Sequence, residues 1–463
     1  MIGISSGRRI PSASALLCAG LLTCAVSASA QTSHLRVPYS TDTLPNGLIL
    51  VVHEDHSTPI VTVSTLRRVG SADEKPGRTG FAHLYEHLMF MGSEHAPYPM
   101  FDRLLEAAGA NNNAYTTEDR TVYYEWGPAT ALPLMLWLEA DRTGWFLPTM
   151  DSVKVDLQRD VVKNERRQSY ENQPYGLANE TILRMLYPPQ HPYHWPVIGS
   201  MADLTAASLE DVKDFFRRYY APDNTTMVVA GDVKSDSVRR LVHGWFERIP
   251  RGPSISRPTL PGFSLQHDTT ATLEDRVQLP RLYYTWHTVR RGQQDDAPLR
   301  ILAYILTGAK NGRLTQPMVY ERQIASDVSA IPDHKRLDGN FTIQATARPG
   351  KALPELQVFV DSELTRLAQT GPTERELQQA KNATEASFLS RLETVSGKAE
   401  QMNQYLYYTG EADYFQKDLD RYLAVTAGDV QRVARQYLQR PKVILSVVPE
   451  GKRNLAAERR MQP

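Results

Sequence analysis

The chain has 463 residues, and its 52 Lys and Arg residues balance its 52 Asp and Glu residues, so the net formal charge is zero. This balance argues against a polyanion-binding protein, because no basic excess is available to neutralise phosphates. An apolar content of 41% with 22% charged residues argues against wholesale disorder. At roughly 150 residues per domain, the length predicts two to three domains.

The first thirty residues have the layout of a secretory signal peptide. Arg8 and Arg9 precede a charge-free, small and apolar run over residues 12–26, and a small-residue Ala-Ser-Ala motif ends at Ala30. We therefore predict a signal peptide over residues 1–30, cleavage before Gln31 and a periplasmic protein. A disordered or membrane-anchoring N-terminus is the alternative interpretation.

Both cysteines of the chain, Cys18 and Cys24, lie inside this segment. Lipoprotein attachment at Cys24 is not favoured, because Thr23 stands where a small Ala or Gly is usual. The mature chain is then free of cysteine and has a net charge of −2, which excludes a disulfide or a thiolate metal site. Any metal must be bound by His, Asp and Glu. No later segment approaches the roughly 18 uninterrupted apolar residues of a membrane-spanning helix, so no membrane span is expected.

In chain order, the first half predicts strands interleaved with helices. Asn46-Gly47 between two apolar runs indicates a hairpin. Residues 79–91 have helical spacing, with Thr79 as a possible N-cap. Strands are further predicted over 60–66 and 121–126, and helices over 132–145 and 153–170.

A proline-rich stretch divides the mature chain. It predicts a linker over residues 250–263 between an N-terminal domain over 31–249 and a C-terminal domain over 264–463. The segments that start at Asp211 and Asp429 match at a constant offset of 218, and both read as helix, short turn and apolar strand. The offset indicates an internal duplication; the alternative is coincidence between two ordinary helix–strand units.

The second half predicts strands over 277–286 and 341–347 and helices over 299–306 and 374–392. Because the helices cluster in long runs, we predict an α+β fold. It consists of two homologous α/β sandwich domains, each a mostly antiparallel sheet with helices packed on one face.

The strongest chemical signal is the segment His83-Leu84-Tyr85-Glu86-His87. On a helix, residues i and i+4 lie on one face, so His83 and His87 can bind one metal ion together. Glu86 borders that face and suits a general base acting on a water held by the metal. The alternative is a polar helix face whose histidines are only hydrogen-bonded.

A catalytic zinc site needs a third protein ligand. We favour Glu165, which lies three residues after Val162 and so shares a helix face with buried-type residues. Spacing alone does not select it, and a solvated helix face is an equal alternative. Nearby rivals are Glu139, Asp141 and Glu171.

The His-x-x-Glu-His motif, together with the glutamate of VVKNE 82 residues after His83, resembles the pitrilysin/insulinase family of zinc metallopeptidases, in its small processing-peptidase-like class. The segment Asn113-Ala114-Tyr115-Thr116 and the run Leu44–Val52 are also similar to that family. The resemblance spans nearly all of the mature chain.

The resemblance carries expectations for the site. It implies that His83, His87 and Glu165 hold one Zn²⁺ per chain and that Glu86 is the base. It further implies a chamber formed by two paired chains, in which a peptide substrate binds as an added β-strand at a sheet edge. Asn113, Ala114 and Tyr115 are the matching substrate-binding residues.

The chain departs from the family pattern in two places. Gln158 stands where relatives usually carry a Glu that supports the third ligand, so its role beside the ligands is weakened. Val319 and Ser326 stand where active relatives often carry an Arg and a Tyr that grip the substrate. We therefore predict a heterodimer in which a related non-zinc chain supplies the pair, with a homodimer as the alternative.

The sequence as a whole predicts a periplasmic zinc endopeptidase that hydrolyses short or unfolded peptides. Two alternatives remain: a non-catalytic assembly subunit of the same fold, and a maturase for one peptide precursor. Another divalent metal in place of zinc also remains open, and no nucleic-acid partner is expected.

Overall fold

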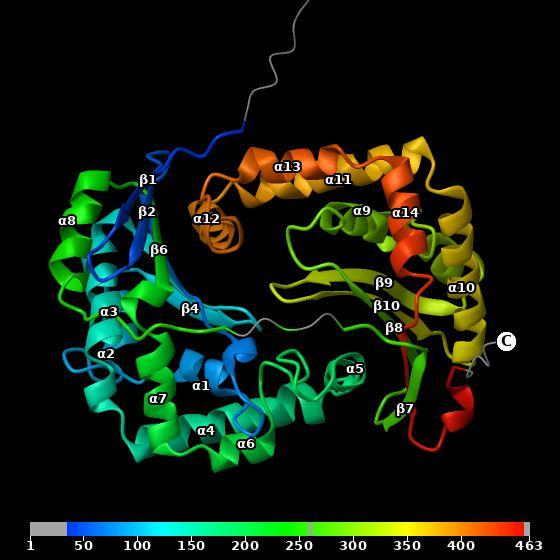
Figure 1. Ribbon diagram of the computed structural model, residues 1–463, viewed down its shortest axis with the longest axis horizontal. Coiled ribbons are helices and arrows are strands. Elements are labelled where there is room, and N and C mark those ends of the chain that lie inside the picture. The colour runs from blue at the N-terminus through cyan, green and yellow to red at the C-terminus, as the bar shows by residue number, and fades with distance from the viewer. Residues whose placement is uncertain (1–34, 258–259, 261–262, 458–463) are drawn as a thin grey trace, which may run out of the picture. The chain divides into compact units, whose positions relative to one another are not determined.

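The computed structural model of the chain describes residues 35–257, 260 and 263–457 (Figure 1). The predicted signal peptide, with Cys18 and Cys24, lies outside the described residues, as does part of the predicted linker. Among the described residues, no helix is long and apolar enough to cross a membrane.

Two sheets organise the structure. The first has six strands in the order β1 (Ser40–Thr43), β2 (Ile49–Glu54), β6 (Thr225–Gly231), β3 (Ile60–Arg67), β5 (Thr121–Pro128), β4 (Asn111–Thr116). The second has five strands in the order β7 (Thr269–Asp275), β11 (Val443–Pro449), β8 (Arg281–Thr288), β10 (Gly339–Ala347), β9 (Ala325–His334). The pairs β2–β6 and β7–β11 are parallel and the other neighbours are antiparallel.

Helices surround both sheets. Those of the first half are α1 (Phe81–Leu88), α2 (Met100–Ala107), α3 (Leu132–Gly144), α4 (Ser152–Arg166), α5 (Ala178–Leu186), α6 (Met201–Ala206), α7 (Leu209–Tyr219) and α8 (Ser235–Phe246). Those of the second half are α9 (Asp296–Thr307), α10 (Leu353–Thr370), α11 (Glu374–Arg391), α12 (Val395–Thr409), α13 (Phe415–Leu423) and α14 (Ala427–Tyr437). The predicted fold class is confirmed: two α/β units, each with a mostly antiparallel sheet.

The two halves repeat one topology. The order β2-β6-β3-β5-β4 in the first sheet has its counterpart in β7-β11-β8-β10-β9 in the second. The bounds of α7 and β6 reappear in α14 and β11 after an offset of 218 residues. Both helices start with the same capping box, Ser208 with Asp211 and Thr426 with Asp429. The domain boundaries at 249 and 264 stay predictions.

Each sheet packs one face against helices of its own half, and its opposite face receives a helix from the other half. In β3, Val61 and Val63 point into the core shared with α3 and α8, whereas Thr62 and Ser64 point to α12. Figure 1 shows α12 beside β6. Reciprocally, α5 packs on β8 and β11, against Tyr283 among others. The helices expected on one face are thus supplemented by one helix on the opposite face.

Several predicted bounds differ from the structure. Strand β7 was not predicted, because its sequence TTATLED has only two apolar residues, Ala271 and Leu273. The strand predicted over 277–286 is displaced to Arg281–Thr288, after Pro280, which has no N–H for the ladder. The helix predicted over 153–170 ends at Arg166 and continues as one π-helical turn, Arg167–Glu171.

Candidate functional site

Helix α1 carries the candidate site and is fixed by its apolar side. Phe81, Leu84 and Leu88 are buried in one cluster with Val155 and Val162 of α4. The same cluster includes residues of α7, which places α1 between α4, α7 and the first sheet. Burying this side leaves the imidazoles of the motif directed to α4.

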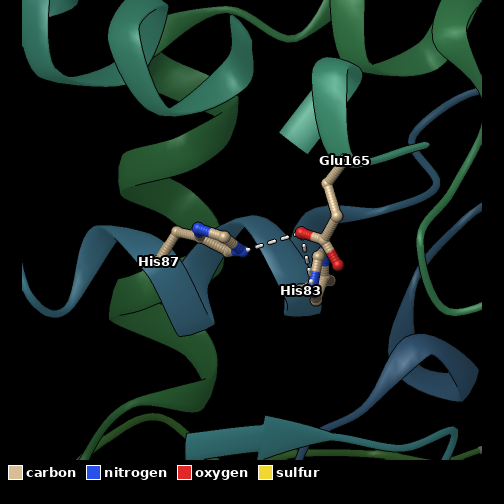
Figure 2. A group of neighbouring side chains, drawn as sticks. All are labelled: His83, His87 and Glu165. Atoms are coloured by element: carbon tan, nitrogen blue, oxygen red, sulfur yellow. Dashed lines mark ion pairs between the residues drawn. The ribbon is translucent and has the colours of Figure 1, made fainter. Parts of the chain in front are cut away.

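The structure brings His83, His87 and Glu165 together (Figure 2). Each offers one ligand atom, and these atoms all lie within 4.8 Å of one another. Oε2 of Glu165 lies 3.3 Å from Nε2 of His87 and 3.7 Å from Nε2 of His83. Figure 2 shows both imidazoles reaching from α1 to the carboxylate that comes from α4. Among the described residues, this is the one His, Cys, Asp or Glu group of three that could hold a metal ion.

The environment favours the forms in which these groups bind metals. Burial lowers the pKa of His83 to about 4, so its imidazole is neutral near pH 7. The hydrogen bond with His87 lowers the pKa of Glu165, which keeps this carboxylate ionised. Neutral imidazole and ionised carboxylate are the ligand forms that Zn²⁺ requires.

The donor set fits zinc in kind and in spacing. Two imidazoles and one carboxylate with an open fourth position are a known ligand set of catalytic zinc. Bonds of about 2.0–2.1 Å in tetrahedral geometry place donor atoms about 3.3 Å apart. The distances from Glu165 to His87 and His83 are 3.3 and 3.7 Å, close to this spacing, and all three donor atoms lie within 4.8 Å of one another.

Glu86 is hydrogen-bonded to the first sheet. Its Oε2 accepts a hydrogen bond of 2.6 Å from the hydroxyl of Thr116, the last residue of β4. Burial raises the pKa of Glu86, and the bond from Thr116 partly offsets this rise. A carboxylate with a raised pKa next to a candidate metal site is suited to proton transfer.

A buried carboxylate holds the start of α1. Glu74 accepts hydrogen bonds from the backbone N–H groups of Gly80 (2.9 Å) and Ala82 (2.8 Å) and from Nε1 of Trp195 (3.1 Å). The prediction of Thr79 as N-cap is wrong: Gly80 occupies the cap position with φ of +91°, and it has no side chain to cap the helix. Glu74 supplies the acceptor that Gly80 lacks.

Sequence reasoning did not find Glu74 or Thr116. The absence of a capping side chain in Gly-Phe-Ala was a usable signal for Glu74, because the first N–H groups of a buried helix need an acceptor from elsewhere. Thr116 belongs to the segment Asn113-Ala114-Tyr115-Thr116 that resembles the family, but nothing in that segment indicates its bond to Glu86, which spans 30 residues.

The other residues singled out in the sequence have separate positions. Gln158 lies on α4 and donates its amide to Sδ of Met91 at 2.8 Å. Asn113, Ala114 and Tyr115 belong to β4, which ends the strand order of its sheet. The rivals for the third ligand bind elsewhere: Glu139 pairs with Arg142, Asp141 with His95, and Glu171 with Arg166.

The comparisons with known proteins match both halves of the chain. The family described as insulinase (peptidase family M16) matches residues 49–189, and the peptidase M16 inactive domain matches residues 206–384. The zinc protease PqqE of Helicobacter pylori is 30% identical over 86% of this chain and 89% of its own length. The chain belongs to the peptidase M16 family. The resemblance to the insulinase/pitrilysin family is thereby confirmed.

Other relatives of this M16 chain agree in name and in fold. An uncharacterized zinc protease of Streptomyces coelicolor is 26% identical and covers 88% of each chain. The crystal structure of a protease from Helicobacter pylori has a TM-score of 0.83 at 27% identity, with 90% of this chain and all of that chain covered. A Pseudomonas fluorescens structure described as a peptidase M16 inactive domain has a TM-score of 0.81 at 18% identity, which supports the fold alone.

Proposed function

We propose that this chain is a zinc-dependent endopeptidase that hydrolyses short or unfolded peptides. One observation carries the proposal: the donor atoms of His83, His87 and Glu165 converge within 4.8 Å, and the carboxylate of Glu86 lies on the same helix as the two imidazoles. The names of the M16 relatives as zinc proteases support it.

Each group of residues has its own role in the proposed reaction. His83, His87 and Glu165 would hold Zn²⁺, which when bound acts as a Lewis acid toward the scissile carbonyl and lowers the pKa of a water. Glu86 takes the proton of the attacking water and returns it to the leaving amine. The outer edge of β4, which ends the strand order of its sheet, binds the peptide as an added strand, with Asn113, Ala114 and Tyr115 as candidate contacts.

We propose in addition that a related chain completes the site. Val319 lies in a π-helical turn packed on the core, and the hydroxyl of Ser326 lies 3.3 Å from Asp327, so neither position offers a cation or a phenol to a substrate. A heterodimer with a non-zinc sister chain would enclose a chamber, and the sister chain would supply the missing Arg and Tyr. A homodimer is the alternative.

A non-catalytic assembly subunit is the second candidate function. It is favoured by the missing gripping pair and by the match of residues 206–384 to the inactive domain of the family. Trimming of one peptide precursor is the narrower form of the enzymatic proposal. The assembly subunit and the precursor-trimming enzyme would share the fold, and only the second would cleave peptides.

Export also belongs to the proposal. Cleavage between Ala30 and Gln31 would release a periplasmic chain with domains 31–249 and 264–463 on either side of the linker. N-terminal sequencing of the protein recovered from the periplasm would locate the cleavage site directly.

The proposal is tested by metal analysis together with a quenched-peptide assay. The purified chain should contain one zinc ion, lose cleavage on chelation and regain it when zinc is restored. The assay is repeated with the candidate sister chain, which should raise the rate. A zinc-loaded chain that cleaves no peptide, alone or with the sister chain, would support the assembly subunit instead.

A further inference from the structure

The bond between Thr116 and Glu86 joins the site to the edge of the first sheet. Thr116 ends β4, and its hydroxyl donates to Oε2 of Glu86 at 2.6 Å. A glutamate side chain has three rotatable bonds, whereas a strand residue has a backbone fixed by its ladder, here Thr116 opposite Thr121. The strand therefore selects one position for the carboxylate on α1.

A general base needs its carboxylate to be held in one position. Its carboxylate must lie within hydrogen-bond reach of the proton that it removes, and a tolerance of about 0.5 Å applies to catalytic groups. Glu86 is half-buried on α1, and the hydroxyl of Thr116 is a donor from outside that helix.

The turn that follows Thr116 is held by a buried carboxylate. Asp119 is 2% exposed and accepts hydrogen bonds from Oη of Tyr193 (2.7 Å), from the backbone N–H of Arg336 (2.7 Å) and from Oη of Tyr408 (3.2 Å). Its backbone carbonyl accepts a fourth bond, from Oη of Tyr407 (3.0 Å). Three of these four donors belong to the second half of the chain.

Glu118, which precedes Asp119 in the turn, also contacts both halves of the chain. Glu118 forms an ion pair of 2.9 Å with Lys335, again in the second half. Its carbonyl accepts the backbone N–H of Ala72 at 2.8 Å. Gly70 permits this approach, because a Cβ there would lie 2.4 Å from the carbonyl oxygens of Thr117 and Glu118. The turn is thus fixed from two directions.

We propose that Thr116 is a positioning residue for Glu86, and that the Asp119 cluster (Asp119, Tyr193, Arg336, Tyr407 and Tyr408) holds the end of the strand that carries it. The inference rests on the proposed function of Glu86 as base. It gives the half without metal ligands a part in the reaction, because most of the cluster comes from that half.

If Thr116 had only a structural role, its variants would rank differently in activity. Valine has the shape of threonine without the hydroxyl, and serine keeps the hydroxyl with less volume. If the packing of the threonine methyl group matters, Thr116→Ser should lower kcat more than Thr116→Val. If the hydroxyl positions Glu86, Thr116→Val should lower kcat more. Thr65→Val is the matched control, since Thr65 is fully buried in the same sheet and the structure shows no hydrogen-bond partner for its hydroxyl among the described residues.

The first experiment compares these three variants. Thr116→Val should lower kcat by about 10- to 100-fold, a share of the roughly 10²–10⁴-fold that a positioned general base contributes. Its zinc content and KM should stay close to wild type. Thr116→Ser should keep most of kcat, and Thr65→Val should equal wild type. A kcat for Thr116→Val within about twofold of wild type, or a serine variant as slow as the valine variant, overturns the proposal.

Crystal structures of the same variants provide a readout that is independent of activity. Glu86 should occupy one conformer in the wild type and in Thr116→Ser, and several in Thr116→Val. A single unchanged conformer in Thr116→Val overturns the positioning role even if the wild type proves inactive. An inactive wild type with the expected conformers overturns the proposed function and leaves the positioning role standing.

The Asp119 cluster is tested by Asp119→Asn and by the milder Tyr408→Phe, which also serve if Thr116→Val does not fold. Both should raise amide hydrogen exchange over residues 111–120 and lower kcat without loss of zinc. Tyr320→Phe, which alters an exposed tyrosine, is the control. Unchanged exchange in Asp119→Asn contradicts a role of the cluster in holding β4.

Discussion

Glu165 is the member of the candidate metal site that depends most on tertiary structure. His83 and His87 share one helix, whereas Glu165 comes from α4. Its side chain is 40% exposed, against 11% for His83, so solvent competes for it. Its position follows from Val155 and Val162, which are buried against α1 and turn the face of α4 that carries Glu165 to the imidazoles.

We predict that Glu165→Gln weakens zinc binding by more than the roughly 10- to 100-fold that the loss of an outer hydrogen-bond partner costs. The amide is a poorer ligand than the carboxylate because it carries no charge. Competition with a chelator of known affinity measures the change. Glu171→Gln is the control, since Glu171 was a rival for the third ligand and pairs with Arg166 at 3.4 Å. Zinc loss in the control with retention in Glu165→Gln would reverse the assignment.

The sequence was sufficient for residues whose neighbours are local. Helical periodicity put His83 and His87 on one face, whereas spacing alone left Glu165 open between a third ligand and a solvated helix face. It was not sufficient for Thr116 or Asp119, because their partners lie 30 to 289 positions away. No local pattern encodes such pairs.

The same limit applies to elements. The predicted bounds of the helix over 374–392 lie within one residue of α11, since Thr373 and Glu376 form a local capping box. Strand β7 went unpredicted because its place beside β11 is decided by a partner far along the chain. A local capping box can therefore fix a helix end, as in α11, whereas long-range pairing decides the strand order.

Helix α12 is the element that joins the halves most closely. Asn403, which is fully buried, donates its amide to the backbone carbonyl of Ser64 (2.8 Å) and to its hydroxyl (3.0 Å). Its own carbonyl oxygen accepts the hydroxyl of Thr226 at 2.6 Å. One side chain of the second half thus satisfies polar groups on two strands of the first sheet.

We predict that Asn403→Ala lowers the free energy of unfolding by about 1–3 kcal/mol, because it leaves buried polar groups of Ser64 and Thr226 without their partner. Denaturant titration measures this loss. Gln401→Ala, a half-buried position on the same helix, should change stability much less. An equal loss in both variants would mean that helix propensity, and not the contact of Asn403, is responsible.

At the scale of the whole molecule, each half covers a sheet face of the other. Helix α12 packs on β3 and β6, and α5 packs on β8 and β11. Lys398 of α12 adds an ion pair of 2.5 Å to Asp55, which follows β2. We therefore expect the two sheets to unfold in one transition.

The ion pair between Asp55 and Lys398 makes the contact between the two halves sensitive to acid. The hydrogen bond from Lys398 lowers the pKa of Asp55 from its ordinary value of 3.8. A carboxyl whose pKa is lower in the folded state stabilises the protein above the unfolded-state pKa and loses that share as the pH falls. Lys398→Met should therefore be less stable than wild type at pH 6, with the difference shrinking below about pH 4.

Thermal unfolding at a series of pH values measures the effect. Lys351→Met is the matched control, because its pair with Glu355 at 3.0 Å is exposed and contributes little. A stability difference between Lys398→Met and wild type that does not depend on pH would contradict the role of the ion pair.

The central claim is that Glu86 is the base of a zinc peptidase, and Glu86→Gln tests it most directly. Glutamine has nearly the same shape and cannot accept the proton. The variant should bind zinc as the wild type does and lose peptide cleavage by about 10²–10⁴-fold. Glu106→Gln, an exposed carboxylate on α2, should keep full activity. Cleavage by zinc-loaded Glu86→Gln at the wild-type rate would contradict the account.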